Sequence, residues 1–188
     1  MEQIDPRHLL VKVVQILGEL DIPYIVTGGI AVFVWGRPRF TDDIDIVVEL
    51  KAKKIDALAE ELRKISEASY ANANMMRDAL RNQGEFNFID GTTGVKVDFW
   101  ISKGDEFNRN RFARKITKKI LGEDVSFIAP EDLILAKLRW QQISPSSKQL
   151  EDVISIFKIS GEKLDRKYLA KWVEKLGVQD LYFKVVKD

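Results

Sequence analysis

Three aspartates in two strand-like segments are the residues best suited to do chemistry. Residues 43–48, DIDIVV, alternate acidic and apolar side chains with the period of a β-strand, so Asp43 and Asp45 point to one face. Their Cα atoms are expected to lie about 6.6 Å apart, and two such carboxylates repel each other unless a cation lies between them. A third acid, Asp98, stands between apolar residues in VKVDFW, residues 95–100. Oxygen ligands of this kind predict a site for a hard divalent cation.

A glycine pair, Gly28 and Gly29, precedes the acidic segment. It follows a predicted short buried strand at residues 24–26 and begins a predicted helix at residues 30–35. Without Cβ atoms the backbone can approach an anion, and a helix N-terminus presents unpaired N–H groups. Alone, two glycines are more typical of a tight turn with positive φ. Together with the acids downstream, they predict a phosphate-binding turn.

The order of these motifs resembles the DNA polymerase beta-like nucleotidyltransferase superfamily. The pattern is two glycines, 13 intervening residues, DID at residues 43–45, and a distant VDF at residues 97–99. The lead-in RFT at residues 39–41, and PEDLI followed by Lys137, are similar to a small prokaryotic branch that includes abortive-infection toxin-like nucleotidyltransferases. The resemblance implies an α+β nucleotidyltransferase fold, in which a mixed β-sheet carries the acidic strands, helices pack on the sheet, and a C-terminal helical extension follows.

The resemblance also implies an activity and a role for each motif residue. It implies a metal-dependent nucleotidyltransferase that moves a nucleoside monophosphate from an NTP to an acceptor hydroxyl and releases pyrophosphate, with two Mg²⁺ (or Mn²⁺) ions. The acceptor is expected to be an RNA such as tRNA, a protein or a small molecule, and a toxin–antitoxin partner is expected. The implied catalytic and metal-binding residues are Asp43, Asp45 and Asp98, and the implied nucleotide-binding residues are Gly28, Gly29, Arg39, Thr41 and Lys137.

Alternatives stay open at several positions. A binding or regulatory module of the same fold, antitoxin-like and with little or no catalysis, is the second hypothesis, although the complete set of acids favours the enzyme. Arg39 fits either a phosphate contact or charge balance for the local acids. Lys137 and Asp152 fit either a nucleotide site or an ion pair between helices. Lys96 shares the face of Asp98 by parity, and an exposed strand lysine is the favoured interpretation there.

Composition limits the classes of partner. The 188 residues carry a formal net charge of +1 and no cysteine, so neither a global field for nucleic acid nor thiol chemistry is expected. Residues 107–115, FNRNRFARK, form the most basic stretch, which fits either an RNA or triphosphate contact or a solvated helix face. With no signal peptide and no apolar run of transmembrane length, we expect a cytoplasmic protein without a membrane partner.

The remaining patterns predict the elements that position these residues. A helix capped by Asp5 and Pro6 opens the chain, and residues 1–128 form the predicted nucleotidyltransferase core. Residues 129–188 form a predicted helical extension that packs on the core and walls its cleft. Asp42 is placed outside the site by parity. Helices are predicted at residues 53–68, 74–80, 130–142, 150–159 and from Asp165 to Gly177; hairpins at residues 86–101 and 115–128; and a helix or strand at residues 178–186.

Overall fold

The computed structural model describes residues 5–41 and 43–187, and Asp42 lies outside the described part. The chain divides into two compact units. The first unit comprises Met1–Ile30 and Thr41–Phe127, and the second comprises Ala31–Phe40 and Ile128–Asp188. The division therefore passes through helix α2, Gly28–Trp35.

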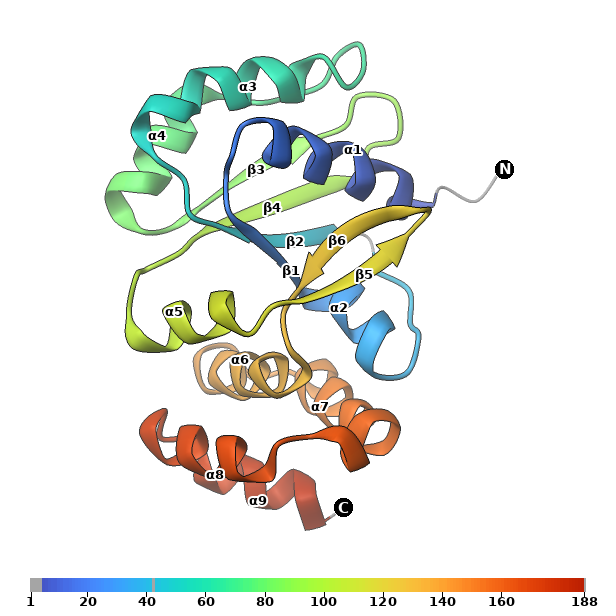
Figure 1. Cartoon of the computed structure of the whole chain (residues 1–188), viewed down its shortest axis with the longest axis vertical. Coiled ribbons are helices and arrows are strands. Elements are labelled where there is room, and N and C mark those ends of the chain that lie inside the picture. Colours follow the sequence, from blue (N-terminus) through green and yellow to red (C-terminus); the bar gives the residue numbers. More distant parts are fainter. Residues whose placement is uncertain (1–4, 42, 188) are drawn as a thin grey trace. The chain divides into compact units, whose positions relative to one another are not determined.

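The first unit is built on a mixed sheet of six strands in the order β3-β4-β2-β1-β6-β5 (Figure 1). Strand β1 pairs antiparallel with β2 and parallel with β6, while β2 pairs parallel with β4. Strands β3 and β5 form antiparallel hairpins with β4 and β6, which confirms both predicted hairpins. The strands are β1 Tyr24–Thr27, β2 Asp43–Val48, β3 Glu85–Ile89, β4 Lys96–Ile101, β5 Ile116–Ile120 and β6 Glu123–Phe127.

Alternation along the two central acidic strands separates apolar from acidic side chains. Ile44 and Ile46 of β2 and Phe99 of β4 are fully buried, and Phe99 stacks on Phe86 of β3 with ring centroids 4.8 Å apart. The acidic positions between them are only partly buried. The period of two therefore anchors each strand by its apolar residues and leaves the other face for polar chemistry.

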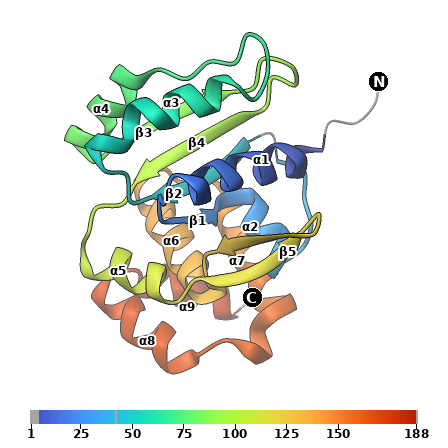
Figure 2. The same cartoon turned by 45° about the horizontal axis from the view of Figure 1, so that its top comes forward.

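Helices α1 (Pro6–Glu19), α3 (Ile55–Arg63) and α4 (Ala73–Asn82) lie side by side along the sheet (Figures 1 and 2). The predicted start of α1 is confirmed, because the Asp5 carboxylate accepts a hydrogen bond from the Arg7 N–H at 3.0 Å and Pro6 occupies the first turn. Helix α5, Glu106–Ala113, follows β4 and contains most of the basic stretch.

Four helices make up most of the second unit: α6 (Pro130–Ile143), α7 (Ser147–Ser160), α8 (Arg166–Lys175) and α9 (Gln179–Lys187). Helix α6 packs against α7 and α8, and α9 packs against the same two helices. The segment at residues 178–186, predicted as helix or strand, is thus helical from Gln179 onward. Within the described residues, no helix has the length and apolar character needed to cross a membrane.

The second unit also holds the end of α2 and the loop after it. The Trp35 indole donates a hydrogen bond to the Ile128 carbonyl at 2.9 Å, and the Ser160 hydroxyl donates to the Trp35 carbonyl at 2.6 Å. Gly36 lies so close to α7 that a Cβ there would come within 3.2 Å of the Ile156 nitrogen. Ala31–Phe40, which precede β2 in the sequence, therefore pack with the C-terminal helices.

Candidate active site

Strand pairing brings the three predicted aspartates to neighbouring positions in the first unit. In the parallel register of β2 and β4, Asp45 stands opposite Asp98, and Asp43 stands opposite Lys96. Because all four residues occupy alternate positions, their side chains leave the same face of the sheet. Adjacent strands are separated by about 4.8 Å, so Asp45 and Asp98 are close neighbours although 52 residues separate them in the chain.

The turn between β1 and α2 packs directly on this acidic pair. Gly28 has φ +61°, and a Cβ there would lie 2.5 Å from the Asp45 Cγ and 2.7 Å from its Cβ. Gly29 meets Thr41 in the same way, since a Cβ would lie 2.8 Å from that of Thr41. Both predicted glycines are therefore required by close approach, and Gly28 also by its positive φ.

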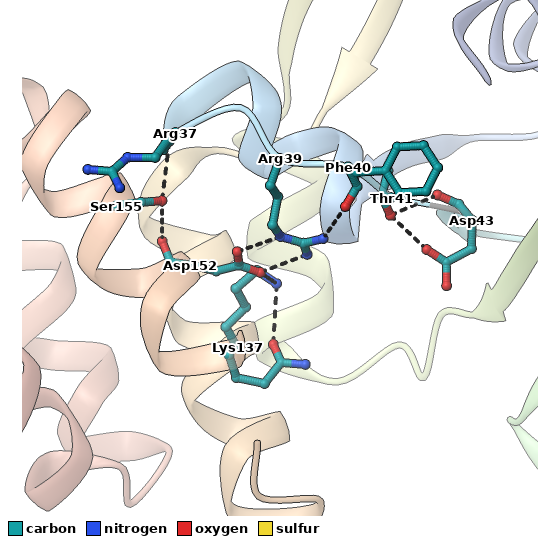
Figure 3. Close-up of polar contacts among 9 residues, drawn as sticks. Arg37, Arg39, Phe40, Thr41, Asp43, Lys137, Asp152 and Ser155 are labelled. Atoms are coloured by element: carbon teal, nitrogen blue, oxygen red, sulfur yellow. Dashed lines mark hydrogen bonds and ion pairs between the residues drawn. The ribbon is translucent and has the colours of Figure 1, made fainter. Parts of the chain in front are cut away.

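Thr41 holds the first aspartate of the strand. Its hydroxyl donates a hydrogen bond to Asp43 Oδ1 at 2.9 Å (Figure 3). Because Thr41 also faces Gly29, the predicted residues Gly28, Gly29, Thr41, Asp43, Asp45 and Asp98 form one contiguous group, which we call the acidic site.

Two further side chains, Lys96 and Trp100 of β4, contact the acidic site. The Lys96 ammonium lies 2.7 Å from Asp98 Oδ2, and the Trp100 indole donates a hydrogen bond to Asp45 Oδ1 at 3.3 Å. The hydrogen bond to Asp98 raises the pKa of Lys96, against a smaller opposing effect of burial, and the charges of all three aspartates add to the rise. Lys96 is thus a charged partner of the acids, whereas its sequence pattern favoured an exposed strand lysine.

The acidic site has the donor chemistry of a hard-cation site. Among residues 5–41 and 43–187, no group of three or more His, Cys, Asp or Glu side chains is arranged as a metal-binding cluster. The carboxylates nevertheless come from adjacent backbone positions, and all of their donors are oxygen, which suits Mg²⁺ or Mn²⁺ and not a typical zinc site. Lys96 neutralises Asp98 in the arrangement seen here.

Arg39 and Lys137, also predicted to bind nucleotide, lie in the second unit and meet on Asp152. Arg39 donates to both oxygens of Asp152, at 2.7 and 2.9 Å, and the Lys137 ammonium lies 2.7 Å from Oδ2 (Figure 3). Lys137 also donates to Gln149 Oε1 at 3.2 Å. We call Arg39, Lys137 and Asp152 the Asp152 network. Arg39 thus pairs with a carboxylate that is 113 residues away in the sequence.

Two members of the Asp152 network are buried, and Arg39 is partly buried. The side chains of Lys137 and Asp152 are 7% and 4% exposed. Burial raises the pKa of Asp152, but the Arg39 hydrogen bonds and the Lys137 charge outweigh it and leave the pKa below its usual value. The ion pair between α6 and α7 that Lys137 and Asp152 suggested is therefore present, and their nucleotide-binding role stays a prediction.

The loop that carries Arg39 has a second attachment to α7. The Ser155 hydroxyl accepts a hydrogen bond from the Arg37 N–H at 3.3 Å and donates to the Asp152 carbonyl at 2.9 Å (Figure 3). No local pattern in the sequence indicates this attachment. Only the resemblance pointed to Asp152, and nothing pointed to Ser155.

The predicted basic stretch, residues 107–115, covers α5 from its second residue onward and the two residues after it. Phe107 and Asn108 are buried, and the Arg111 guanidinium lies 5.6 Å from the centre of the Phe107 ring. Arg109 donates to the Gly104 carbonyl. Contact with RNA or triphosphate stays a prediction for this segment.

Solved structures share the fold. An antigenic nucleotidyltransferase-like protein from Paracoccidioides brasiliensis aligns with a TM-score of 0.52 and 22% identity over 79% of this chain and 74% of its own. ANT(2'')-Ia in complex with adenylyl-2''-tobramycin aligns with a TM-score of 0.59 and 13% identity over 92% of this chain and 97% of its own. The lincomycin-bound lincosamide antibiotic adenylyltransferase LnuA aligns with a TM-score of 0.55 and 12% identity over 83% of this chain and 98% of its own. These likenesses confirm the predicted α+β nucleotidyltransferase fold.

No curated protein sequence matches the chain. A family match, in contrast, covers residues 14–175, which include both glycines, all three site aspartates and the Asp152 network. The match confirms the resemblance on which the site residues were chosen. The chain belongs to the family described as "Nucleotidyl transferase AbiEii toxin, Type IV TA system".

Proposed function

We propose that this chain transfers a nucleoside monophosphate from an NTP to an acceptor hydroxyl, with release of pyrophosphate, at the acidic site. The observation that carries the proposal is the register of β2 and β4, which puts Asp45 opposite Asp98 with Asp43 on the same face. Gly28 closes on Asp45 from the β1–α2 turn, so a phosphate-binding backbone and a set of acids are adjacent.

Asp43, Asp45 and Asp98 would hold Mg²⁺ or Mn²⁺. When bound, such ions neutralise the reacting phosphate and lower the pKa of the attacking hydroxyl. Thr41 orients Asp43 through its 2.9 Å hydrogen bond, and Trp100 fixes one oxygen of Asp45. These contacts keep two carboxylates in place before substrate arrives.

Gly28 and Gly29 bind the phosphates of the nucleotide. They form the first turn of α2, whose N–H groups have no partner within the helix. The positive φ of Gly28 and the missing Cβ atoms let these N–H groups approach phosphate oxygens. Arg39 and Lys137 are proposed as further nucleotide-binding residues on the family resemblance alone, since both are engaged by Asp152 here.

The acceptor is proposed to be an RNA such as tRNA, a protein or a small molecule. ANT(2'')-Ia was solved with an adenylylated antibiotic, and the matching family is described as a toxin of type IV toxin–antitoxin systems. We propose that the chain acts as the toxin of such a pair, with a cognate antitoxin as its partner.

The test is transfer of label from each α-³²P-labelled NTP, with Mg²⁺ or Mn²⁺, to the RNA, protein and small-molecule fractions of a cell extract. Asp43→Asn, Asp45→Asn and Asp98→Asn are each expected to reduce transfer at least about 100-fold, because each removes a metal-binding oxygen. Asp124→Asn is the matched control, since Asp124 is an exposed strand carboxylate whose partner is Lys119 at 3.0 Å.

Each outcome decides between the two hypotheses. Transfer that is lost in the three site variants and kept in Asp124→Asn supports the enzyme. If no fraction gains label from any NTP, and a partner binds the wild type and Asp43→Asn equally well, the regulatory module replaces the proposed enzyme.

A further inference from the structure

Lys96 forms an ion pair with Asp98, an aspartate of the acidic site. It stands opposite Asp43 in the β2–β4 register, and its ammonium lies 2.7 Å from Asp98 Oδ2. Its side chain is 44% exposed, whereas that of Asp98 is 13% exposed. The lysine thus approaches a mostly buried carboxylate from the solvent side.

Charge and exposure together suggest what this lysine does. The three aspartates are like charges on one face of the sheet, and Lys96 places a positive charge beside them. Like charges on adjacent strands destabilise a sheet, so the acids need a counter-charge when no metal is bound. A half-exposed ion pair is weak, so Asp98 can leave it for a stronger cation.

We infer that Lys96 is a positioning residue that serves as the counter-ion of Asp98 in the metal-free protein and yields this carboxylate to the divalent cation. The inference rests on the proposed function, because it takes the acidic site to be the metal site. Lys96 then has two measurable effects of opposite sign. It stabilises the metal-free fold, and it competes with metal for Asp98.

Lys96→Met tests both effects, and Lys119→Met is its matched control. Lys119 is also a strand lysine of the first unit, with its ammonium 3.0 Å from the Asp124 carboxylate. In EDTA, Lys96→Met is expected to melt about 2–4 °C below Lys119→Met, and saturating Mn²⁺ is expected to remove the difference. In a calorimetric titration, Mn²⁺ is expected to bind Lys96→Met about fivefold more tightly than Lys119→Met.

The two measurements check each other, because stability without metal and metal affinity form one thermodynamic cycle. When saturating Mn²⁺ makes the two variants equally stable, a fivefold gain in affinity requires a loss of stability of matching size in EDTA. Lys96→Arg keeps the charge and is expected to behave as wild type in both measurements.

Three results would overturn the inference: equal melting of Lys96→Met and Lys119→Met in EDTA, unchanged or weaker Mn²⁺ binding by Lys96→Met, or Lys96→Arg behaving like Lys96→Met. Failure of the proposed metal site looks different. In that case the wild type and Asp43→Asn bind Mn²⁺ equally weakly, while melting in EDTA still reports whether Lys96 holds the acids.

Discussion

Gly28 leaves no room for a side chain against Asp45, so adding one methyl group there tests whether the position of Asp45 matters for activity. Gly28→Ala adds a Cβ that would lie 2.5 Å from the Asp45 Cγ, at a residue with φ +61°. We expect it to displace Asp45, to reduce nucleotidyl transfer at least about 100-fold, and to cost roughly 1–3 kcal/mol of unfolding free energy. Label transfer and urea unfolding measure the two effects.

Gly94→Ala separates the clash from the backbone strain. Gly94 has φ +71° in the β3–β4 turn, but no heavy atom lies within 4 Å of the Cβ position. Gly94→Ala is expected to lose stability because alanine is strained at positive φ, and to keep its transfer activity because the added Cβ meets no other atom. If both variants keep activity, Gly28 has no part in the acidic site.

Single residues of the site were predictable where the sequence pattern is local. Asp43 and Asp45 alternate with isoleucines, and that period alone puts them on one face. The partner of Lys96 was not predictable in this way. The alternation of side chains along the strand puts Lys96 on the same face as Asp98. The ion pair between them depends on side-chain conformation, which no sequence pattern encodes.

At the scale of elements, Asp152 joins α6, α7 and the loop before β2. Asp152→Asn is expected to cost about 3–5 kcal/mol of unfolding free energy, because the buried Lys137 ammonium and Arg39 would lose their carboxylate. Urea unfolding at pH 7 measures the loss. The double variant Lys137→Met, Asp152→Asn is expected to recover part of it, since no unpaired lysine remains buried. A loss below about 0.5 kcal/mol in Asp152→Asn would contradict this account.

The same carboxylate predicts a pH dependence. The pKa of Asp152 in the folded chain lies below its usual value of 3.8, so its contribution to stability is present above that pH. It is lost as pH falls through the lowered pKa. The difference in Tm between wild type and Asp152→Asn should therefore be constant at neutral pH and shrink below about pH 3.8. If the difference in Tm between wild type and Asp152→Asn grows on acidification, the pKa of Asp152 is raised in the folded chain and not lowered.

Most elements were predictable from caps, period and turns. Asp5 and Pro6 fixed the start of α1, and Gly91 to Gly94 fixed the turn between β3 and β4. The order of the strands was not predictable from these signals. The parallel pairing of β2 with β4, which makes Asp45 face Asp98, joins segments separated by the whole of α3 and α4.

At the scale of the molecule, the sequence did not show which segments pack into which unit. Residues 31–40 begin with an apolar run and lie shortly before β2 in the sequence, so they were expected in the N-terminal core. Their contacts with Ile128 and Ser160, and that of Arg39 with Asp152, span 93 to 125 residues. Contacts of this range leave no local pattern in a single sequence.

This interleaving predicts how the chain responds to truncation. A fragment of residues 1–127 lacks α6–α9, so the Trp35 indole loses the Ile128 carbonyl and Arg39 loses Asp152. We expect the fragment to lose cooperative thermal unfolding and label transfer, although it contains every residue of the acidic site. Co-expression with residues 128–188 is expected to restore both, because Ala31–Phe40 then regain their packing partners. Circular dichroism melts and label transfer test this, and a fragment 1–127 that unfolds cooperatively at the wild-type Tm would show that residues 31–40 need no C-terminal partner.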